Sequence, residues 1–153
     1  MKIRLLLVGR TDRGAVGDSV AAYVKRIERL TAFEQVVVAE AGTGAPAYQQ
    51  RVECERLLAA IKPGERVVVL DERGTHLTSP AFADRLGKWR DQGVKQVTFV
   101  IGGAYGLNDA MRDRADLVLA LSAMTFPHQL VRALFAEQLY RAYTILNGTP
   151  YHH

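Results

Sequence analysis

Short apolar runs alternate with amphipathic segments along the chain, and this alternation limits the possible fold more than any other feature. Five runs are short and rich enough in Val, Ile and Leu to be buried strands: Ile3–Val8, Val36–Val38, Val67–Leu70, Val97–Ile101 and Leu117–Leu121. Between them, apolar residues recur at three- and four-residue spacing, as in helices with one buried face. The alternation predicts an α/β fold, with a mostly parallel sheet covered by helices on both faces.

Capping and turn residues indicate where the helices begin and end. We expect helix starts at Asp18 or Ser19, at Ser79–Pro80, at Leu107 and at Pro127. A further helix is expected to carry Cys54, Leu57, Leu58 and Ile61 on one side and to stop at 62–64. The last helix is predicted to have one apolar face made of Leu130, Val131, Leu134, Phe135, Leu139 and Tyr143.

Length and composition predict a single soluble domain over residues 1–153. The chain is 48% hydrophobic and 24% charged, which is ordinary for a globular protein. Its net charge of +4 is compatible with a nucleic-acid partner without requiring one. The single cysteine, Cys54, excludes an internal disulfide and fits a reducing cytoplasm. No segment has the length of a membrane span, so no membrane partner is expected.

Three loops follow predicted strands and are expected to meet. They come after Leu70, Ile101 and Leu121, and the carboxyl ends of parallel strands share one edge of a sheet. The second loop contains a GGxxG cluster at 102–106, which is either a tight turn or a close backbone approach to a ligand. The third, Ser122–Phe126, offers backbone groups and apolar side chains but no carboxylate. This suits an adenine-like ring better than a metal or a polyphosphate.

The histidines and the end of the chain leave more than one interpretation open. The four histidines lack the spacing of a metal site, so no metal is expected. His128 and Arg132 lie four residues apart and could form a polar patch at the edge of the ligand site. Glu137 and Arg141 have the same spacing and suggest a surface or interface pair. The tail 149–153 could be frayed, or it could fold over the active site.

Three segments of this sequence resemble one protein family. They are 100–107 (VIGGAYGL), 121–132 (LSAMTFPHQLVR) and the terminal 150–153 (PYHH). Together with the opening MKI and Val8-Gly9, they are similar to the SPOUT-class 23S rRNA (pseudouridine-N3)-methyltransferases, the ribosomal RNA large subunit methyltransferase H family. The resemblance extends over the whole chain, and the second segment is its most specific part.

The resemblance implies a fold, a cofactor and a substrate. It implies an α/β sheet whose C-terminal part forms a trefoil knot, and a homodimer packed through the first-strand region and the last helix. The cofactor implied is S-adenosylmethionine, held by Leu70, Gly102, Leu121, Ser122, Ala123, Met124, Thr125 and Phe126. The substrate implied is a pseudouridine in the intersubunit-bridge hairpin of 23S rRNA, methylated at N3 on assembled ribosomes in the cytoplasm.

The chemistry of methyl transfer suggests catalytic candidates. The N3–H of pseudouridine must lose its proton before or as the nitrogen attacks, so a base or a group that stabilises the ring oxygens would help. Histidine suits the role of base, and we expect His152 or His128 to supply it. Arg132 and Tyr151 would place the RNA or stabilise its oxygens.

Three competing functions are kept open. A nucleotide-dependent oxidoreductase would need a GxGxxG fingerprint after the first strand, and residues 9–14 do not supply it. A ribosome-associated protein without catalysis would not take up S-adenosylmethionine. Another SPOUT methyltransferase acting on tRNA would share the fold but not the substrate.

Overall fold

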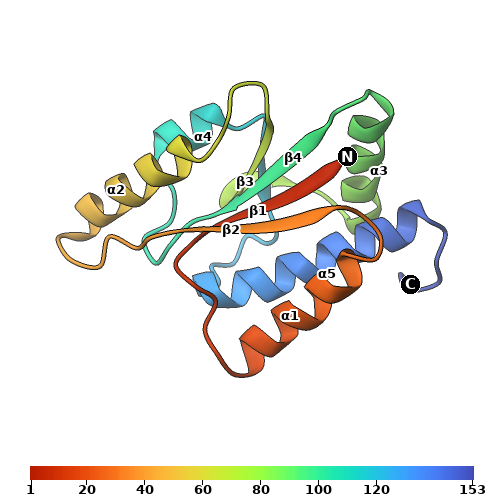
Figure 1. The fold of residues 1–153 in the computed structure, drawn as a ribbon, viewed down its shortest axis with the longest axis horizontal. Coiled ribbons are helices and arrows are strands. Elements are labelled where there is room, and N and C mark those ends of the chain that lie inside the picture. Colours follow the sequence, from red (N-terminus) through yellow and green to blue (C-terminus); the bar gives the residue numbers. More distant parts are fainter.

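The computed structural model describes residues 1–153 as a five-stranded sheet with helices on both sides (Figure 1). The elements in chain order are β1 (Lys2–Val8), α1 (Ala15–Ile27), β2 (Phe33–Val38), α2 (Pro46–Ala59), β3 (Arg66–His76), α3 (Ser79–Asp91), β4 (Gln96–Ile101), α4 (Asp109–Arg114), β5 (Leu117–Ala120) and α5 (His128–Leu146). The strand order is β2-β1-β4-β3-β5, and every neighbouring pair is parallel. The predicted alternation and the covered parallel sheet are confirmed.

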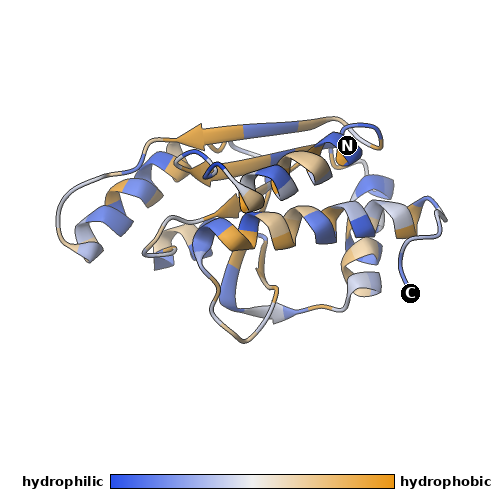
Figure 2. Ribbon diagram, turned by 90° about the horizontal axis from the view of Figure 1, so that it is seen from below, coloured by the Kyte–Doolittle hydropathy of each residue, from blue (hydrophilic) through white to orange (hydrophobic).

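Both faces of the sheet are buried, which explains why its strands are apolar without interruption. In β1, Ile3, Leu5 and Leu7 join the larger core, which packs against α1, α3 and α5. Leu6 and Val8 point the other way, into a smaller core under α2 and α4. Figure 2 shows the strands as mainly hydrophobic ribbons between helices of mixed character. No helix combines the length and hydrophobicity needed to span a bilayer.

The first two helices differ from their predicted bounds. α1 begins at Ala15, so Asp18 and Ser19 lie inside the helix and neither caps it. Gly14 occupies the cap position with φ 106°, a conformation open mainly to glycine, and this turn sets the start. α2 ends at Ala59, before the expected stop at 62–64, which leaves Ile61 outside the helix.

The later helices start within one or two residues of their predicted positions. Thr78 caps α3 in place of Ser79, because its hydroxyl oxygen accepts the Ala81 N–H at 3.2 Å. Asn108 caps α4, which therefore begins at Asp109 and not at Leu107. Pro127 precedes α5 as its cap residue. In α3 and α4 a side-chain cap occupies the position just outside the helix, whereas Pro127 precedes α5 without a side-chain cap bond.

The apolar residues of α5 divide into two groups. Phe135, Leu139 and Tyr143 are buried in the larger core, as predicted. Leu130 and Leu134 are 38% and 36% exposed, so the prediction that they share the buried face is wrong. Their spacing is helical, but they lie along the outer side of the helix.

β3 continues beyond its predicted end and contacts β5 twice. Leu119 of β5 is paired with both Leu70 and Thr75 of β3. Between these pairings the chain passes close to the backbone of β5. A Cβ atom on Gly74 would lie 2.5 Å from the carbonyl oxygen of Val118. Residues 71–74 therefore form a bulge in β3 that packs tightly against β5, although the sequence suggested only a strand end there.

Candidate functional site

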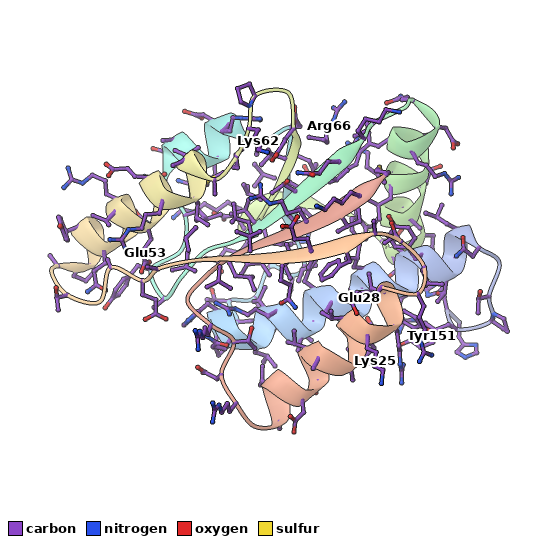
Figure 3. All side chains as sticks on the ribbon, viewed as in Figure 1. Lys25, Glu28, Glu53, Lys62, Arg66 and Tyr151 are labelled. Carbon is purple, nitrogen blue, oxygen red and sulfur yellow. The ribbon has the colours of Figure 1, made fainter.

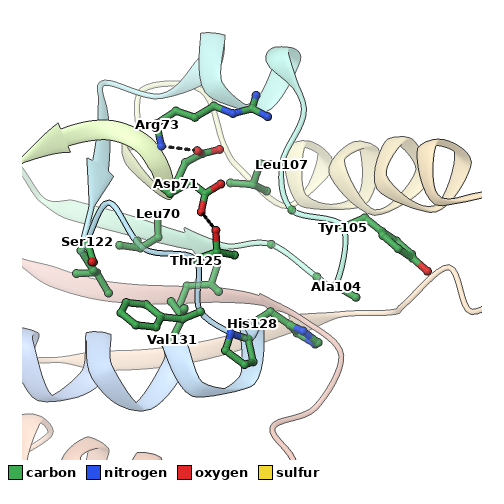
Figure 4. Close-up of a pocket in the computed structure, with 18 of the residues that line it drawn as sticks. Leu70, Asp71, Arg73, Ala104, Tyr105, Leu107, Ser122, Thr125, His128 and Val131 are labelled. Carbon is green, nitrogen blue, oxygen red and sulfur yellow. Dashed lines mark hydrogen bonds between the residues drawn. The ribbon is translucent and has the colours of Figure 1, made fainter.

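The bulged part of β3 that follows Leu70 and the loops after β4 and β5 line one cavity of about 670 Å³ (Figure 4). This volume falls within the range of roughly 300–1,000 Å³ that is typical of small-molecule sites. The residues expected at the cofactor that line it are Leu70, Gly102, Leu121, Ser122, Met124, Thr125 and Phe126. Ala123 is exposed and is not among the lining residues. The predicted convergence of the three loops is therefore observed.

Close backbone packing shapes the side of the cavity made by the β4 loop. A Cβ on Gly102 would lie 2.9 Å from the backbone carbon of Gly106. Gly106 itself has φ 73°, in the left-handed region. A side chain at position 102 would therefore displace the loop, and the glycines form the tight turn that the GGxxG pattern allowed, in which the Gly106 N–H donates to the Gly103 carbonyl at 3.0 Å; the close approach to a ligand stays a prediction.

A buried carboxylate under this loop was not anticipated from the sequence. Glu53 of α2 is 5% exposed, and its Oε2 accepts the Ala41 N–H at 3.0 Å. A Cβ on Gly103 would lie 2.6 Å from Glu53 Oε1. Glu53 thus fills the space behind Gly103 and limits where the loop can move. Its position in the helical pattern offered no signal for this role.

Two acidic side chains from the bulge of β3 border the cavity. Arg112 donates to Asp71 Oδ2 at 3.1 Å and to the Leu107 carbonyl at 2.6 Å. The hydrogen bond with Asp109, followed by that with Asp71, raises the pKa of the Arg112 guanidinium. Glu72 also lines the cavity, and its carboxylate accepts the hydroxyl of Thr125. This last hydrogen bond joins β3 to the β5–α5 loop. The sequence pattern indicated only a strand end at 71–74 and gave no sign of this contact.

His128 and Arg132 occupy different environments although they lie one turn apart on α5. His128 lines the cavity. Arg132 is fully buried outside it and donates to the Val8 carbonyl at 2.6 Å and the Gly9 carbonyl at 2.9 Å. Burial lowers the pKa of its guanidinium. The two side chains therefore do not form the polar patch that their spacing suggested.

The C-terminal tail is attached to the far half of α5. The Tyr151 hydroxyl donates to Glu137 Oε1 at 3.0 Å, and Arg141 Nη1 lies 3.2 Å from His152 Nδ1. The Arg141 guanidinium also stands 4.8 Å from the centre of the Tyr151 ring. Figure 3 shows Tyr151 at the opposite end of the molecule from Glu53, which lies under the cavity loop.

The distance along α5 separates the tail from the cavity of its own chain. Arg141 lies thirteen positions after His128 on α5, which corresponds to roughly 20 Å at 1.5 Å per residue. Within one chain, His128 is therefore the only member of the predicted catalytic set that lines the cavity. No group of three or more His, Cys, Asp or Glu side chains is arranged to hold a metal ion.

Comparison with known proteins places this cavity in a family. A family model described as "Predicted SPOUT methyltransferase" matches residues 1–152. The chain belongs to the SPOUT methyltransferase family. Its relatives include ribosomal RNA large subunit methyltransferase H of Geobacter metallireducens, 50% identical over 157 residues, with 100% of this chain and 99% of that protein covered. The protein of the same name from Anaeromyxobacter sp. is 48% identical, with 99% of each chain covered.

A solved structure supports the fold of this SPOUT methyltransferase. A probable methyltransferase from Bordetella pertussis superposes with a TM-score of 0.58 at 16% identity, covering 93% of this chain and 96% of that one. The family match supports S-adenosylmethionine as the cofactor, as the resemblance implied. The cavity fits such a molecule, because apolar side chains such as Leu70, Leu121 and Val131 can contact an adenine while Asp71 and Glu72 border a polar edge.

Proposed function

We propose that this protein transfers a methyl group from S-adenosylmethionine to N3 of a pseudouridine in the intersubunit-bridge hairpin of 23S rRNA on assembled ribosomes. The observation that carries the proposal is the cavity where the bulge of β3 meets the loops after β4 and β5, which is lined by all the residues that the family resemblance assigns to the cofactor except Ala123. The names of relatives that match over the full chain support ribosomal RNA as the substrate. Action on ribosomes would place the protein in the cytoplasm.

The cofactor residues proposed are Leu70, Gly102 and the segment 121–126. When bound, S-adenosylmethionine supplies an activated methyl group, so the protein's task is alignment, which is a major source of rate. The hydrogen bond between Glu72 and Thr125 joins β3 to the β5–α5 loop at the cavity. We further propose that the bulge at Gly74 is part of a trefoil knot, through which the chain segment that contains β5 is threaded.

A homodimer is proposed, and two features of the single chain support it. Leu134 borders a second cavity of about 620 Å³ between α1, α5 and residues 77–79, which a second copy could cover. The tail is also too far from the cavity of its own chain to act there. In a dimer that packs through α5, His152 and Tyr151 can reach the cavity of the partner subunit.

The proposed chemistry needs a base for the imide proton and a donor for the ring oxygens. His152, or else His128, is proposed as the base. The pKa of the Tyr151 phenol is raised by burial and by its hydrogen bonds with Tyr23 and Glu137. Tyr151 therefore stays protonated at neutral pH, and its O–H, which donates to Glu137 in the single chain, would have to turn to the RNA to donate there. Arg132 is buried away from the cavity, so its proposed part in placing the RNA is indirect.

The test is methylation of purified ribosomes that lack the modification, with the product located by mass spectrometry. His152→Ala should lower kcat by about 100-fold or more, the scale of general-base catalysis, and leave the Kd for S-adenosylmethionine within about twofold. His153→Ala, the adjacent and equally exposed histidine, is the matched control and should retain activity. Equal losses of turnover and cofactor affinity in His152→Ala would show that the tail is only structural.

The dimer is tested by mixing two inactive variants. A Gly102→Val chain lacks the cofactor pocket, and a His152→Ala chain lacks the tail histidine. Mixed dimers should regain activity, because one of their two sites combines an intact pocket with an intact tail. No recovery after subunit exchange would contradict action in the partner's site. Methyl groups found on tRNA, or no cofactor uptake in calorimetry, would instead favour the alternative functions.

A further inference from the structure

The loop between β1 and α1, residues 9–14, is fastened to the helix turn that lines the cavity. The Asp12 N–H donates to Gln129 Oε1 at 2.9 Å, and Gln129 Nε2 donates to the Arg10 carbonyl at 3.2 Å. Gln129 follows His128 directly, so the loop lies beside the mouth of the cavity. Figure 4 shows the chain that leaves β1 turning down next to His128.

The buried Arg132 of α5 also forms hydrogen bonds with this loop and with the end of β1. The Arg132 guanidinium donates to the carbonyls of Val8 and Gly9 and to Thr11 Oγ1, the last at 3.0 Å. No carboxylate lies within ion-pair distance, although a buried cation is costly without one. Its hydrogen bonds to β1 and the loop offset part of this cost, and the carboxylates of Asp12 and Glu40, beyond ion-pair distance, add a favourable charge interaction. The loop is anchored to α5 at four of its first residues, from position 9 to position 12.

The two arginine side chains of this loop remain free. Arg10 and Arg13 are exposed, and neither guanidinium has a hydrogen bond or an ion pair within the chain. Asp12 is the acidic residue between them, and its side chain is exposed as well. In contrast, Arg112 and Arg141 each form an ion pair with a carboxylate. Two unpaired guanidinium groups on a fixed backbone match the geometry of phosphate oxygens.

We infer that Arg10 and Arg13 bind backbone phosphates of the RNA next to the target nucleotide, and that Gln129 and Arg132 position them. The inference rests on the proposed RNA substrate and names the surface that receives it. Because the loop is held before binding, less conformational entropy is lost when the phosphates dock. The loop lies beside His128, so phosphates held there would direct the attached nucleoside toward the cavity.

The test measures kcat/KM for ribosomes as a function of salt in R10Q, R13Q and the double variant. Each phosphate contact contributes a slope of about 0.7–0.9 to the dependence of log affinity on log salt. Between about 50 and 200 mM KCl, the wild type should therefore lose about 7- to 12-fold more kcat/KM than the double variant. The Kd for S-adenosylmethionine should not change. R29Q removes an equally exposed arginine beyond the other end of α1 and should behave like the wild type.

The positioning role is tested with Q129A in a double-mutant cycle. Q129A should raise the KM for ribosomes in the wild type and have no further effect when Arg10 and Arg13 are already replaced. Additive effects would overturn the positioning role, and an unchanged salt slope in the double variant would overturn the phosphate site. In both cases the wild type still methylates ribosomes. Failure of the proposed function would appear differently, as a wild type without activity on ribosomes.

Discussion

The tight packing of Gly74 in β3 against the backbone of β5 makes one substitution especially informative. Gly74→Ala would place a methyl group 2.5 Å from the Val118 oxygen, 2.6 Å from the Val118 carbonyl carbon and 2.9 Å from the Leu119 nitrogen. All three are backbone atoms in the middle of a paired strand. They cannot rotate away as a side chain can, so either β5 or residues 71–74 must shift.

The magnitude follows from the size of this overlap. Ordinary contact for a Cβ begins at 3.4 Å, so the closest atom is about 0.9 Å too near. Overpacking of a well-packed interior costs about 1–3 kcal/mol, and rigid backbone neighbours place Gly74→Ala at the upper end of that range. For a chain of this size, about 3 kcal/mol corresponds to a Tm lower by roughly 6–12 °C. Asp71 and Glu72 line the cavity and lie in the same bulge as Gly74. We therefore also expect the Kd for the cofactor to rise about tenfold, a loss of about 1.4 kcal/mol of binding free energy.

Circular dichroism during thermal unfolding and calorimetric titration with S-adenosylmethionine measure the two effects. Gly87→Ala is the matched control, because its Cβ would meet only the flexible end of Leu146 at 2.9 Å. Alanine is favoured over glycine inside a helix by about 1 kcal/mol, so this variant should be as stable as the wild type or more stable. If Gly74→Ala had the same Tm and the same cofactor affinity as Gly87→Ala, the tight backbone contact between Gly74 and β5 would be refuted.

Two further predictions concern the cavity loop and the buried thiol. Gly102→Ala should weaken cofactor binding about tenfold, because the new Cβ displaces the loop at Gly106. The Tm should change little, because the main core is not involved. Unchanged cofactor affinity in calorimetry would contradict the tight packing of Gly102 against Gly106. Burial raises the pKa of the Cys54 thiol above its unfolded value of about 8.5, so stability present below that pH is lost as pH rises toward the folded pKa. Urea unfolding at about pH 7.5 and 9.5 should show a smaller alkaline loss in Cys54→Ala than in the wild type, and equal losses would assign the effect to other groups.

Local patterns predicted most of the architecture correctly. Strand positions followed from short apolar runs, and Cys54 and Leu57, expected on one side of a helix, are both buried in the core. The same runs placed three loops at one edge of the sheet, because parallel strands share their direction. Helix starts were less accurate, since a cap depends on which nearby hydroxyl or amide reaches the first free N–H. Thr78 and Asn108 do so in α3 and α4.

The candidate site was predictable only where neighbours in the chain form it. The segment 121–126 lines the cavity almost throughout, because it directly follows β5. Glu53 and the bond between Glu72 and Thr125 were not predicted, since their partners come from distant parts of the chain. Arg132 shows the same limit. Its helical position suggested a place beside His128, yet its partners lie more than 120 residues earlier.

By itself the sequence determined the alternation of strands and helices, the edge where the cofactor loops meet and the family to which the chain belongs. These depend on periodicity and on motifs read within a few residues. Only the tertiary structure decided that β3 bulges against β5 at Gly74, that Arg132 supports the β1–α1 loop, and that the tail lies about 20 Å from its own cavity. Each of these depends on which face of an element meets which distant neighbour, and packing of the whole chain selects that face.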